Sequence, residues 1–293
     1  MAYAKYFLSE NKPKIEPQEL NLVIKRALTE DIGCFDITTR LSIPKDKIIT
    51  TKIIAKEDFL LCGIIVARQV FKIIDCGLRF EQKAKEGAWV ASQDVLAVIS
   101  GNAHSILTAE RVALNFISLL SGVATKTAKF VKAIKPHKVK IVDTRKTIPG
   151  LRQLQKYAVR IGGGYNHRMC LDEMILIKDN HLKIMGKYSK FQMPNGYKIE
   201  IETQNLKEFI HVLSLKPDII MLDNMKIQDI QKAVKIRNNL MINCQTCRIT
   251  KLEASGGIHL GNVKKYAATG VEIISIGELT DSIESVDISL EVL

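Results

Sequence analysis

Cationic side chains gather in one short part of the sequence, NHRMCLDEMILIKDNH at residues 166–181. His167 and Arg168 lie at its start, and Lys178 follows a short apolar run. An arginine guanidinium matches a carboxylate or phosphate with two parallel hydrogen bonds, and a lysine adds a compact charge. The segment therefore favours a substrate that carries several carboxylate or phosphate groups.

Further cations extend this pattern. Arg145 and Lys146 follow the apolar residues of VKIVDTRK, with Thr144 beside them, and Arg111 lies in a segment predicted to be helical. Any one of these side chains alone is better explained as a solvated surface charge. Their repeated position directly after β-branched runs favours a shared binding role.

Carboxylates lie near the ends of the later β-branched runs. Glu202 lies in YKIEIET, Asp223 in DIIMLDN and Glu253 in ITKLEASGG. Among phosphate-binding groups, carboxylates hold Mg²⁺ or bind sugar hydroxyls. Residues two apart on a strand face the same side, so Glu200 and Glu202 are either both inside the domain or both outside it. A purely structural role is equally compatible with Glu200.

Glycine-containing turns follow the last two runs. Ser255, Gly256 and Gly257 occur in EASGGI, and Gly277 occurs in SIGE. Backbone N–H groups in such turns bind phosphate, and glycine permits a close approach. The glycine triplet at residues 162–164 precedes a predicted strand, so it does not match the dinucleotide-binding pattern G-x-G-x-x-G. We interpret it as a tight turn that delivers the cations that follow.

Six β-branched runs must position these groups, and polar residues end each of them. The runs are VKIVDTRK (139–146), MILIKDNH (174–181), YKIEIET (197–203), DIIMLDN (218–224), ITKLEASGG (249–257) and VEIISIGE (271–278). Helix-compatible stretches, among them 205–215 and 226–238, separate them. Such βα units form parallel sheets whose functional groups lie at the carboxyl ends of the strands. The pattern predicts an α/β, barrel-like catalytic domain of about six βα units, fewer than the usual eight.

The first part of the chain mixes helix and strand patterns. Residues 17–30 place apolar side chains on one helical face, and residues 48–101 contain two β-rich runs. Residues 105–134 are predicted to be a helix, with Thr108 as a candidate N-cap. Together they predict a small α+β unit that precedes the barrel-like domain.

The composition of the 293-residue chain, with 46% hydrophobic and 25% charged residues, is ordinary for a globular protein. Its net charge of +12 favours anionic partners, but the basic residues are scattered, so no nucleic-acid partner is expected. We expect no apolar window long enough to span a membrane and no membrane partner. Six irregularly spaced cysteines and no amino-terminal signal segment favour a cytoplasmic location. The pair Cys244 and Cys247 lacks the second pair that a zinc site needs.

The motifs of this chain resemble those of quinolinate phosphoribosyltransferase, the family also called nicotinate-nucleotide pyrophosphorylase (carboxylating). They include DTRKTIPGLR, GGGYNHRMCLDEMILIKDNH, LDNM and EASGGI, together with ALTEDIGCFDITT, TAERVALN and ISIGELT. The resemblance implies an amino-terminal α/β sandwich domain over residues 1–120, which the tail 281–293 could join. It also implies an incomplete α/β barrel over residues 121–280.

The resemblance implies that quinolinate and phosphoribosyl pyrophosphate give nicotinate mononucleotide, pyrophosphate and CO₂ in NAD biosynthesis, with Mg²⁺. It implies a homodimer with shared active sites, or a higher oligomer built from it. The implied substrate-binding residues are the partner subunit's Arg111 together with Thr144, Arg145, Lys146, His167, Arg168, Lys178, Glu202, Asp223, Ser255, Gly256, Gly257 and Gly277. The implied catalytic residues are Lys146, Lys178, Glu202 and Asp223, and the last two are also the implied metal ligands.

Three residues depart from the family pattern. Phe35 and Cys170 stand where the family usually has glycine, and Glu278 replaces a small residue after Gly277. A carboxylate beside a phosphate loop repels the phosphate unless it points away or binds metal. Two other interpretations stay open: a relative of the same fold that uses another pyridine or phosphoribosyl substrate, and a nucleic-acid-binding protein on an inactive enzyme scaffold.

Overall fold

The computed structural model describes residues 7–10, 14–186, 194, 196–242 and 250–293. The chain forms two compact units. The barrel unit contains Met1–Asn11, Lys129–Lys146 and Gly164–Asp281, and the sandwich unit contains Lys12–Ala128, Thr147–Gly163 and Ser282–Leu293. Residues 147–163 thus group with the sandwich unit, although the sequence places them in the barrel domain. The predicted boundaries after residues 120 and 280 stay predictions.

Six parallel strands form the sheet of the barrel unit, in the order β6-β11-β10-β9-β8-β7. They are β6 (Lys140–Val142), β7 (Ile175–Ile177), β8 (Ile199–Thr203), β9 (Ile219–Asp223), β10 (Lys251–Ser255) and β11 (Ile273–Ser275). Each lies within one of the six predicted runs. The first two strands in chain order are the two edges of the sheet, so the barrel is open between β6 and β7. The predicted incomplete α/β barrel is confirmed.

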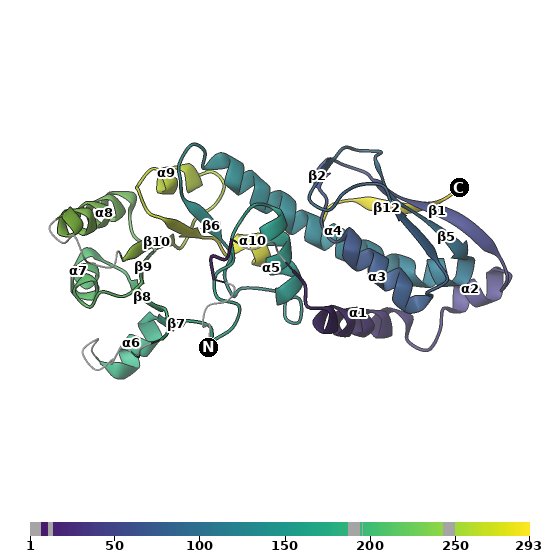
Figure 1. The fold of residues 1–293 in the computed structure, drawn as a ribbon, viewed down its shortest axis with the longest axis horizontal. Coiled ribbons are helices and arrows are strands. Elements are labelled where there is room, and N and C mark those ends of the chain that lie inside the picture. Colours follow the sequence, from purple (N-terminus) through teal and green to yellow (C-terminus); the bar gives the residue numbers. More distant parts are fainter. Residues whose placement is uncertain (1–6, 11–13, 187–193, 195, 243–249) are drawn as a thin grey trace. The chain divides into compact units, whose positions relative to one another are not determined.

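Helices follow the barrel strands. They are α6 (Asp179–Met185), α7 (Leu206–Ser214), α8 (Ile227–Ile242), α9 (Val263–Ala267) and α10 (Glu278–Asp281). Figure 1 shows α7 beside α8, and α7 also packs on β8 and β9. Asn205 begins α7 by accepting the backbone N–H of Glu208 at 3.0 Å. Every residue of β8 is buried, as expected for a strand with the barrel interior on one face and helices on the other.

The sandwich unit is built on a four-stranded antiparallel sheet in the order β12-β1-β5-β3. Its strands are β1 (Ile48–Ala55), β3 (Arg79–Gln82), β5 (Val95–Asn102) and β12 (Ile288–Val292), and β2 (Phe59–Leu60) pairs with β4 (Trp89–Val90). Its helices are α1 (Pro17–Ile32), α2 (Ile37–Ser42), α3 (Ile64–Ile74), α5 (Arg152–Ile161) and most of α4 (Ala103–Ala133). The carboxyl-terminal tail joins this sheet because β12 pairs with β1.

Helix α4 corrects two predictions. It begins at Ala103, five residues before the predicted N-cap Thr108, because the side chain of Asn102 accepts the backbone N–H groups of His104 and Ser105 at 2.9 and 3.3 Å. It also contains an apolar window long enough to span a membrane, which we did not expect from the sequence. Most of that window is buried inside the structure, as in a core helix.

Candidate active site

A cavity of about 880 Å³ lies at the carboxyl ends of the barrel strands. Its lining comes entirely from the barrel unit and includes every predicted site residue except Arg111. The predicted residues that line it are Thr144, Arg145, Lys146, His167, Arg168, Lys178, Glu202, Asp223, Ser255, Gly256, Gly257 and Gly277. Arg111 is exposed on α4 in the sandwich unit, so its contribution to a partner's site stays a prediction.

Asp143, directly after β6, is fully buried and holds the loop of residues 164–169, called the His167 loop below. One Asp143 oxygen accepts the backbone N–H of His167 at 2.9 Å, and the other accepts the side-chain amide of Asn166 at 2.6 Å. Tyr165 adds a parallel bridge to the end of β6. A buried carboxylate needs such donors because its desolvation is otherwise costly. The loop is therefore fixed to β6 by side chain and backbone.

The glycine triplet makes the turn that leads into this loop. Helix α5 ends at Ile161, and Gly163 has a φ of +85°, a left-handed conformation that side chains with a Cβ rarely adopt. The tight turn predicted from the sequence is confirmed.

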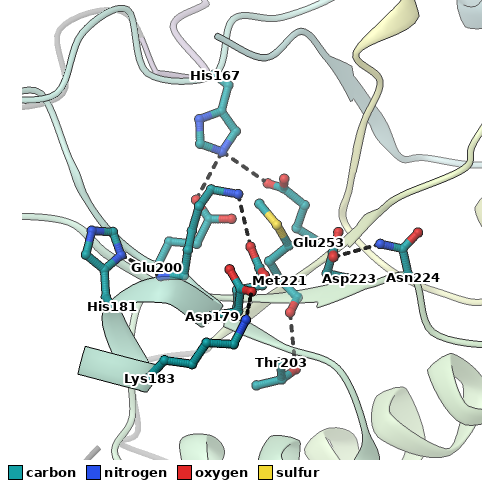
Figure 2. A network of polar contacts seen from close by, with 12 residues as sticks. His167, Asp179, His181, Lys183, Glu200, Thr203, Met221, Asp223, Asn224 and Glu253 are labelled. Atoms are coloured by element: carbon teal, nitrogen blue, oxygen red, sulfur yellow. Dashed lines mark hydrogen bonds and ion pairs between the residues drawn. The ribbon is translucent and has the colours of Figure 1, made fainter. Parts of the chain in front are cut away.

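The ring of His167 is held at both nitrogens. Its Nδ1 accepts the backbone N–H of Arg168 at 2.8 Å, and its Nε2 lies 3.0 Å from Glu200 and 3.6 Å from Glu253 (Figure 2). Because Nδ1 accepts a hydrogen bond, the proton of the neutral ring lies on Nε2 and faces the two carboxylates. The Nε2 contacts lack hydrogen-bond geometry, so the attraction is mainly electrostatic. Glu200 and the buried Glu202 both face the barrel interior, which decides between the two placements left open by the sequence.

The carboxyl groups of Glu200 and Glu253, which both lie near Nε2 of His167, are fully buried and interact electrostatically with one another. Burial, and then the negative charge of Glu200, raise the pKa of Glu253 from its ordinary value to about 8, while His167 acts in the opposite direction. Glu253 therefore keeps its proton at neutral pH. Protonation of Glu253 therefore removes one negative charge from the floor of the cavity.

Arg168 is buried beside other cations. One of its guanidinium nitrogens donates to the backbone oxygen of Met174 at 2.9 Å. Burial, and then the charge of Arg145, lower the pKa of Arg168, and Glu200 opposes this shift. Two guanidinium groups that repel one another suit an anion site, because a bound carboxylate relieves the repulsion.

Lys178 faces the cavity from the end of β7. Its Nζ donates to Glu202 at 3.0 Å, and its backbone N–H donates to the ring of His181 at 3.0 Å, where α6 begins. The Lys178 side chain is about half exposed, whereas the Glu202 side chain is buried. The lysine can therefore turn to an anionic substrate while Glu202 stays fixed in the barrel.

Asp223 and the first glycine turn are joined through Asn224. The Asn224 side chain donates to the Asp223 carboxylate at 2.8 Å, and the Asn224 backbone N–H donates to the backbone oxygen of Ser255 at 2.9 Å. Gly256 has a φ of +90°, and a Cβ on it would lie 2.2 Å from the Asn224 side chain. A Cβ on Gly277 would lie 2.9 Å from Asp281. The left-handed backbone and the close approach of Asn224 thus favour glycine at Gly256, whereas at Gly277 only the side chains of Asp281 and Lys146 would have to move.

Two family models match this chain. The model described as "Quinolinate phosphoribosyl transferase, C-terminal domain" matches residues 123–291, and the corresponding N-terminal domain model matches residues 36–121. The chain belongs to the quinolinate phosphoribosyl transferase family. Both models together cover most of its length, in the order that the sequence motifs predict.

Individual members of the quinolinate phosphoribosyl transferase family are similar over almost the whole chain. A probable carboxylating nicotinate-nucleotide pyrophosphorylase from Synechocystis is 37% identical over 276 residues, covering 92% of this chain and 91% of that protein. One from Methanocaldococcus jannaschii is 40% identical over 278 residues, covering 92% and 96%. The solved nicotinate-nucleotide pyrophosphorylase from Ehrlichia chaffeensis is 38% identical, with a TM-score of 0.87 over 96% of this chain and 100% of that one.

Two groups of side chains in this family member offer metal ligands. Glu202 and Asp223 present carboxylate oxygens to the cavity from neighbouring strands, and such hard oxygen donors fit Mg²⁺. Below them, the donor atoms of His167, Glu200 and Glu253 lie within 4.8 Å of one another. Charge disfavours a cation in the second group, because Arg168 is close to Glu200 and Glu253 retains a proton.

The three departures from the family pattern lie in different surroundings. Glu278 is the first residue of α10 and lines the cavity, so its carboxylate shares the space of the second glycine turn. Cys170 is exposed at the end of the His167 loop, where contact with Asp172 raises the pKa of its thiol. Phe35 lies in the sandwich unit, with the guanidinium of Arg40 4.4 Å from its ring centre. Cys244 and Cys247 lie outside the described residues.

Several functional residues were not identified from the sequence. His259, which shows no useful context in the sequence, lines the cavity directly after the glycine turn. In the sequence Asp143 is only one residue of DTRK, although its position directly after a β-branched run indicates that it lies at a strand end. Phe7 and Glu173 contact the His167 loop. Phe7 lies outside every motif, and Glu173 lies within GGGYNHRMCLDEMILIKDNH without a feature that predicts its role.

Proposed function

We propose that this chain is a carboxylating nicotinate-nucleotide pyrophosphorylase that joins quinolinate to the phosphoribosyl group of phosphoribosyl pyrophosphate. The products are nicotinate mononucleotide, pyrophosphate and CO₂, as a step in NAD biosynthesis. The observation that carries the proposal is the distribution of charge in one cavity. Arg145, Arg168 and Lys178 approach it from β6, the His167 loop and β7, whereas carboxylates and glycine turns approach it from β8 to β11.

Quinolinate suits the cationic side of the cavity. Its two carboxylates match guanidinium groups in bidentate geometry. The ammonium group of Lys178, which donates to Glu202, can turn to a substrate carboxylate and adds a further positive charge. The repulsion between Arg145 and Arg168 falls when an anion lies between them. We assign His167 to this subsite through its contact with the Arg168 backbone.

Phosphoribosyl pyrophosphate suits the other side. The backbone N–H groups around Ser255, Gly256, Gly257 and Gly277 are suited to the phosphate, and Asp223 is suited to the ribose hydroxyls. Glu202 and Asp223 would hold Mg²⁺, which would supply positive charge against the pyrophosphate. Lys146 lies beside the second glycine turn, since a Cβ on Gly277 would be 3.2 Å from its side chain.

The reaction follows from holding both substrates in this geometry. The pyridine nitrogen attacks C1 of the ribose, and the bond from C1 to pyrophosphate breaks with its electron pair on the leaving group. The positively charged ring then accepts the electron pair of the bond to the adjacent carboxylate, CO₂ leaves, and the ring carbon takes up a proton from water. Fixed positive charges and alignment lower the barrier, and no side chain forms a covalent bond.

A direct assay tests the proposal. The purified protein is incubated with Mg²⁺, phosphoribosyl pyrophosphate and either quinolinate or nicotinate, and nicotinate mononucleotide and CO₂ are measured. We expect quinolinate to be consumed and one CO₂ to be released for each nicotinate mononucleotide formed. Turnover of nicotinate alone would overturn the proposal and favour a relative with another pyridine substrate.

The proposal includes a cytoplasmic homodimer in which the partner subunit's Arg111 completes each cavity. Its support is the exposed position of Arg111 on α4 of the sandwich unit, together with a cavity whose lining comes from the barrel unit alone. Mixing two inactive variants, Arg111→Ala and Lys178→Ala, should restore part of the activity, because mixed dimers contain one site with both residues intact. No recovery in dimers shown to exchange subunits would contradict shared sites.

A further inference from the structure

Phe7 belongs to the core of the barrel unit, although the sequence places it in the amino-terminal domain. Its side chain is only 4% exposed and packs with Val142, Met174, Ile219 and Ile273. Ile219 and Ile273 are the first residues of β9 and β11, and Met174 directly precedes β7. The Phe7 ring therefore packs at the amino-terminal ends of β7, β9 and β11 and against Val142 at the end of β6, and it does not line the cavity.

The same ring contacts His167. The two ring centres are 5.2 Å apart at an interplanar angle of 73°, an edge-to-face arrangement that aromatic pairs favour. His167 is thus fixed from three directions: by Phe7, by the Arg168 backbone and by the carboxylates of Glu200 and Glu253. A ring held in this way cannot turn without disturbing the Arg168 backbone.

Glu173 joins the amino-terminal segment to the His167 loop. One of its carboxylate oxygens accepts the backbone N–H of Phe7 at 3.0 Å, and the other accepts the backbone N–H of Met169. The backbone N–H of Leu8 donates to the oxygen of Asn166 at 2.9 Å. These bonds hold the loop on both sides of His167 and Arg168, and the Glu173 side of the network is buried.

We propose that Phe7 and Glu173 are positioning residues for the dicarboxylate subsite: they hold the His167 loop so that Arg168 meets the carboxylates of the substrate. The inference rests on the proposed function, because it names quinolinate as the ligand that the loop serves. Neither residue lines the cavity, so their effect is exerted through His167 and Arg168.

The test uses two variants and a matched control. Phe7→Leu keeps an apolar side chain but removes the aromatic edge, and Glu173→Gln leaves one acceptor where two backbone N–H groups need one each. The control is Phe209→Leu, which removes the same atoms from a buried site on α7 in the same unit. Thermal unfolding of all three full-length proteins measures the general loss of stability.

Steady-state kinetics separates positioning from stability. We expect the KM for quinolinate to rise on the order of tenfold in Phe7→Leu and Glu173→Gln, with little change in the KM for phosphoribosyl pyrophosphate. Phe209→Leu should leave both KM values near those of the wild type. If the three variants lose the same stability and show the same kinetics, Phe7 and Glu173 are ordinary core residues and the proposal fails.

Hydrogen exchange gives a readout that does not depend on turnover. The backbone N–H groups of residues 166–169 should exchange faster in Phe7→Leu and Glu173→Gln than in the wild type, and unchanged exchange there would overturn the positioning role. If the wild type does not turn over quinolinate, the proposed function fails, and with it the ligand assigned to the loop. Even if quinolinate is not a substrate, faster exchange of residues 166–169 in the two variants would show that Phe7 and Glu173 hold the His167 loop.

Discussion

Asp143 at the end of β6 accepts the backbone N–H of His167 at 2.9 Å, across 24 positions of the sequence. The second oxygen of the same buried carboxylate accepts the side chain of Asn166. One carboxylate thus ties the strand that leads to Arg145 to the loop that carries Arg168. The spacing of the two guanidinium groups depends on this link.

Replacing Asp143 by Asn should weaken both the fold and quinolinate binding. Asparagine replaces one of the two carboxylate oxygens by an NH₂ group, which cannot accept, so the hydrogen bond from either His167 or Asn166 is lost. We expect the free energy of unfolding to fall by about 1–3 kcal/mol, measured by urea denaturation, and the KM for quinolinate to rise. Asp229→Asn is the control, since it breaks an exposed ion pair with Lys232, and the expected loss is about 0–1 kcal/mol. Equal stability of the two variants would contradict the role of Asp143.

Removing a single cation from the cavity should reduce quinolinate turnover without unfolding the protein. Arg145→Ala and Lys178→Ala each delete a charge-assisted contact, and we expect kcat/KM for quinolinate to fall on the order of 10- to 100-fold. Lys232→Ala is the control, because it breaks an exposed ion pair with Asp229 on α8 and neither residue lines the cavity. Near-normal turnover in folded Arg145→Ala or Lys178→Ala would refute the assignment of the dicarboxylate subsite.

The barrel and its site could largely be predicted, because in a barrel of parallel strands the functional side chains lie at the carboxyl ends of the strands. Once Asp223 and Ser255 are placed at strand ends, the topology alone brings them to one edge of the sheet. The buried strands are apolar enough to be found as continuous runs. The shared face of Glu200 and Glu202 could also be predicted, since they are two residues apart on β8, but only the structure shows that this face is the barrel interior.

The contacts behind the site could not be predicted in this way. Phe7 and Glu173 act across 166 positions. Phe7 lies in no motif, and Glu173, although it lies in GGGYNHRMCLDEMILIKDNH, has no local feature that predicts its contact with Phe7. The start of α4 was missed because Asn102 and Thr108 are both acceptable N-caps, and only the end of β5 decides between them. Local patterns therefore identified which residues face the cavity, whereas long-range packing decides what holds them there.

The protonated Glu253 should make stability depend on pH. Burial and Glu200 raise its pKa in the folded protein to about 8, above the ordinary value of 4.5. A raised pKa means that its contribution to stability is fully present below pH 4.5 and is lost as the pH rises through 8. Glu253→Gln imitates the protonated form and avoids this loss. The melting temperature of Glu253→Gln minus that of the wild type should therefore increase between pH 5 and pH 8.

The control for this titration is Glu19→Gln, an exposed change on α1 that should show a constant difference over the same pH range. Differential scanning calorimetry of the three proteins in matched buffers provides the comparison. A melting difference for Glu253→Gln that does not change with pH would contradict the retained proton.

The two glycines of the EASGGI turn should respond differently to a methyl group. At Gly256 a Cβ would lie 2.2 Å from the Asn224 side chain, and φ is +90°, so Gly256→Ala adds a clash to a strained backbone. At Gly257 the φ is +60° but nothing lies within 4 Å, so Gly257→Ala adds only the left-handed strain of about 1–2 kcal/mol. We expect Gly256→Ala to lose clearly more stability and to raise the KM for phosphoribosyl pyrophosphate, because the displaced Asn224 also holds Asp223. Unfolding and steady-state kinetics of the two variants decide this, and equal losses would show that Asn224 can move away at no cost.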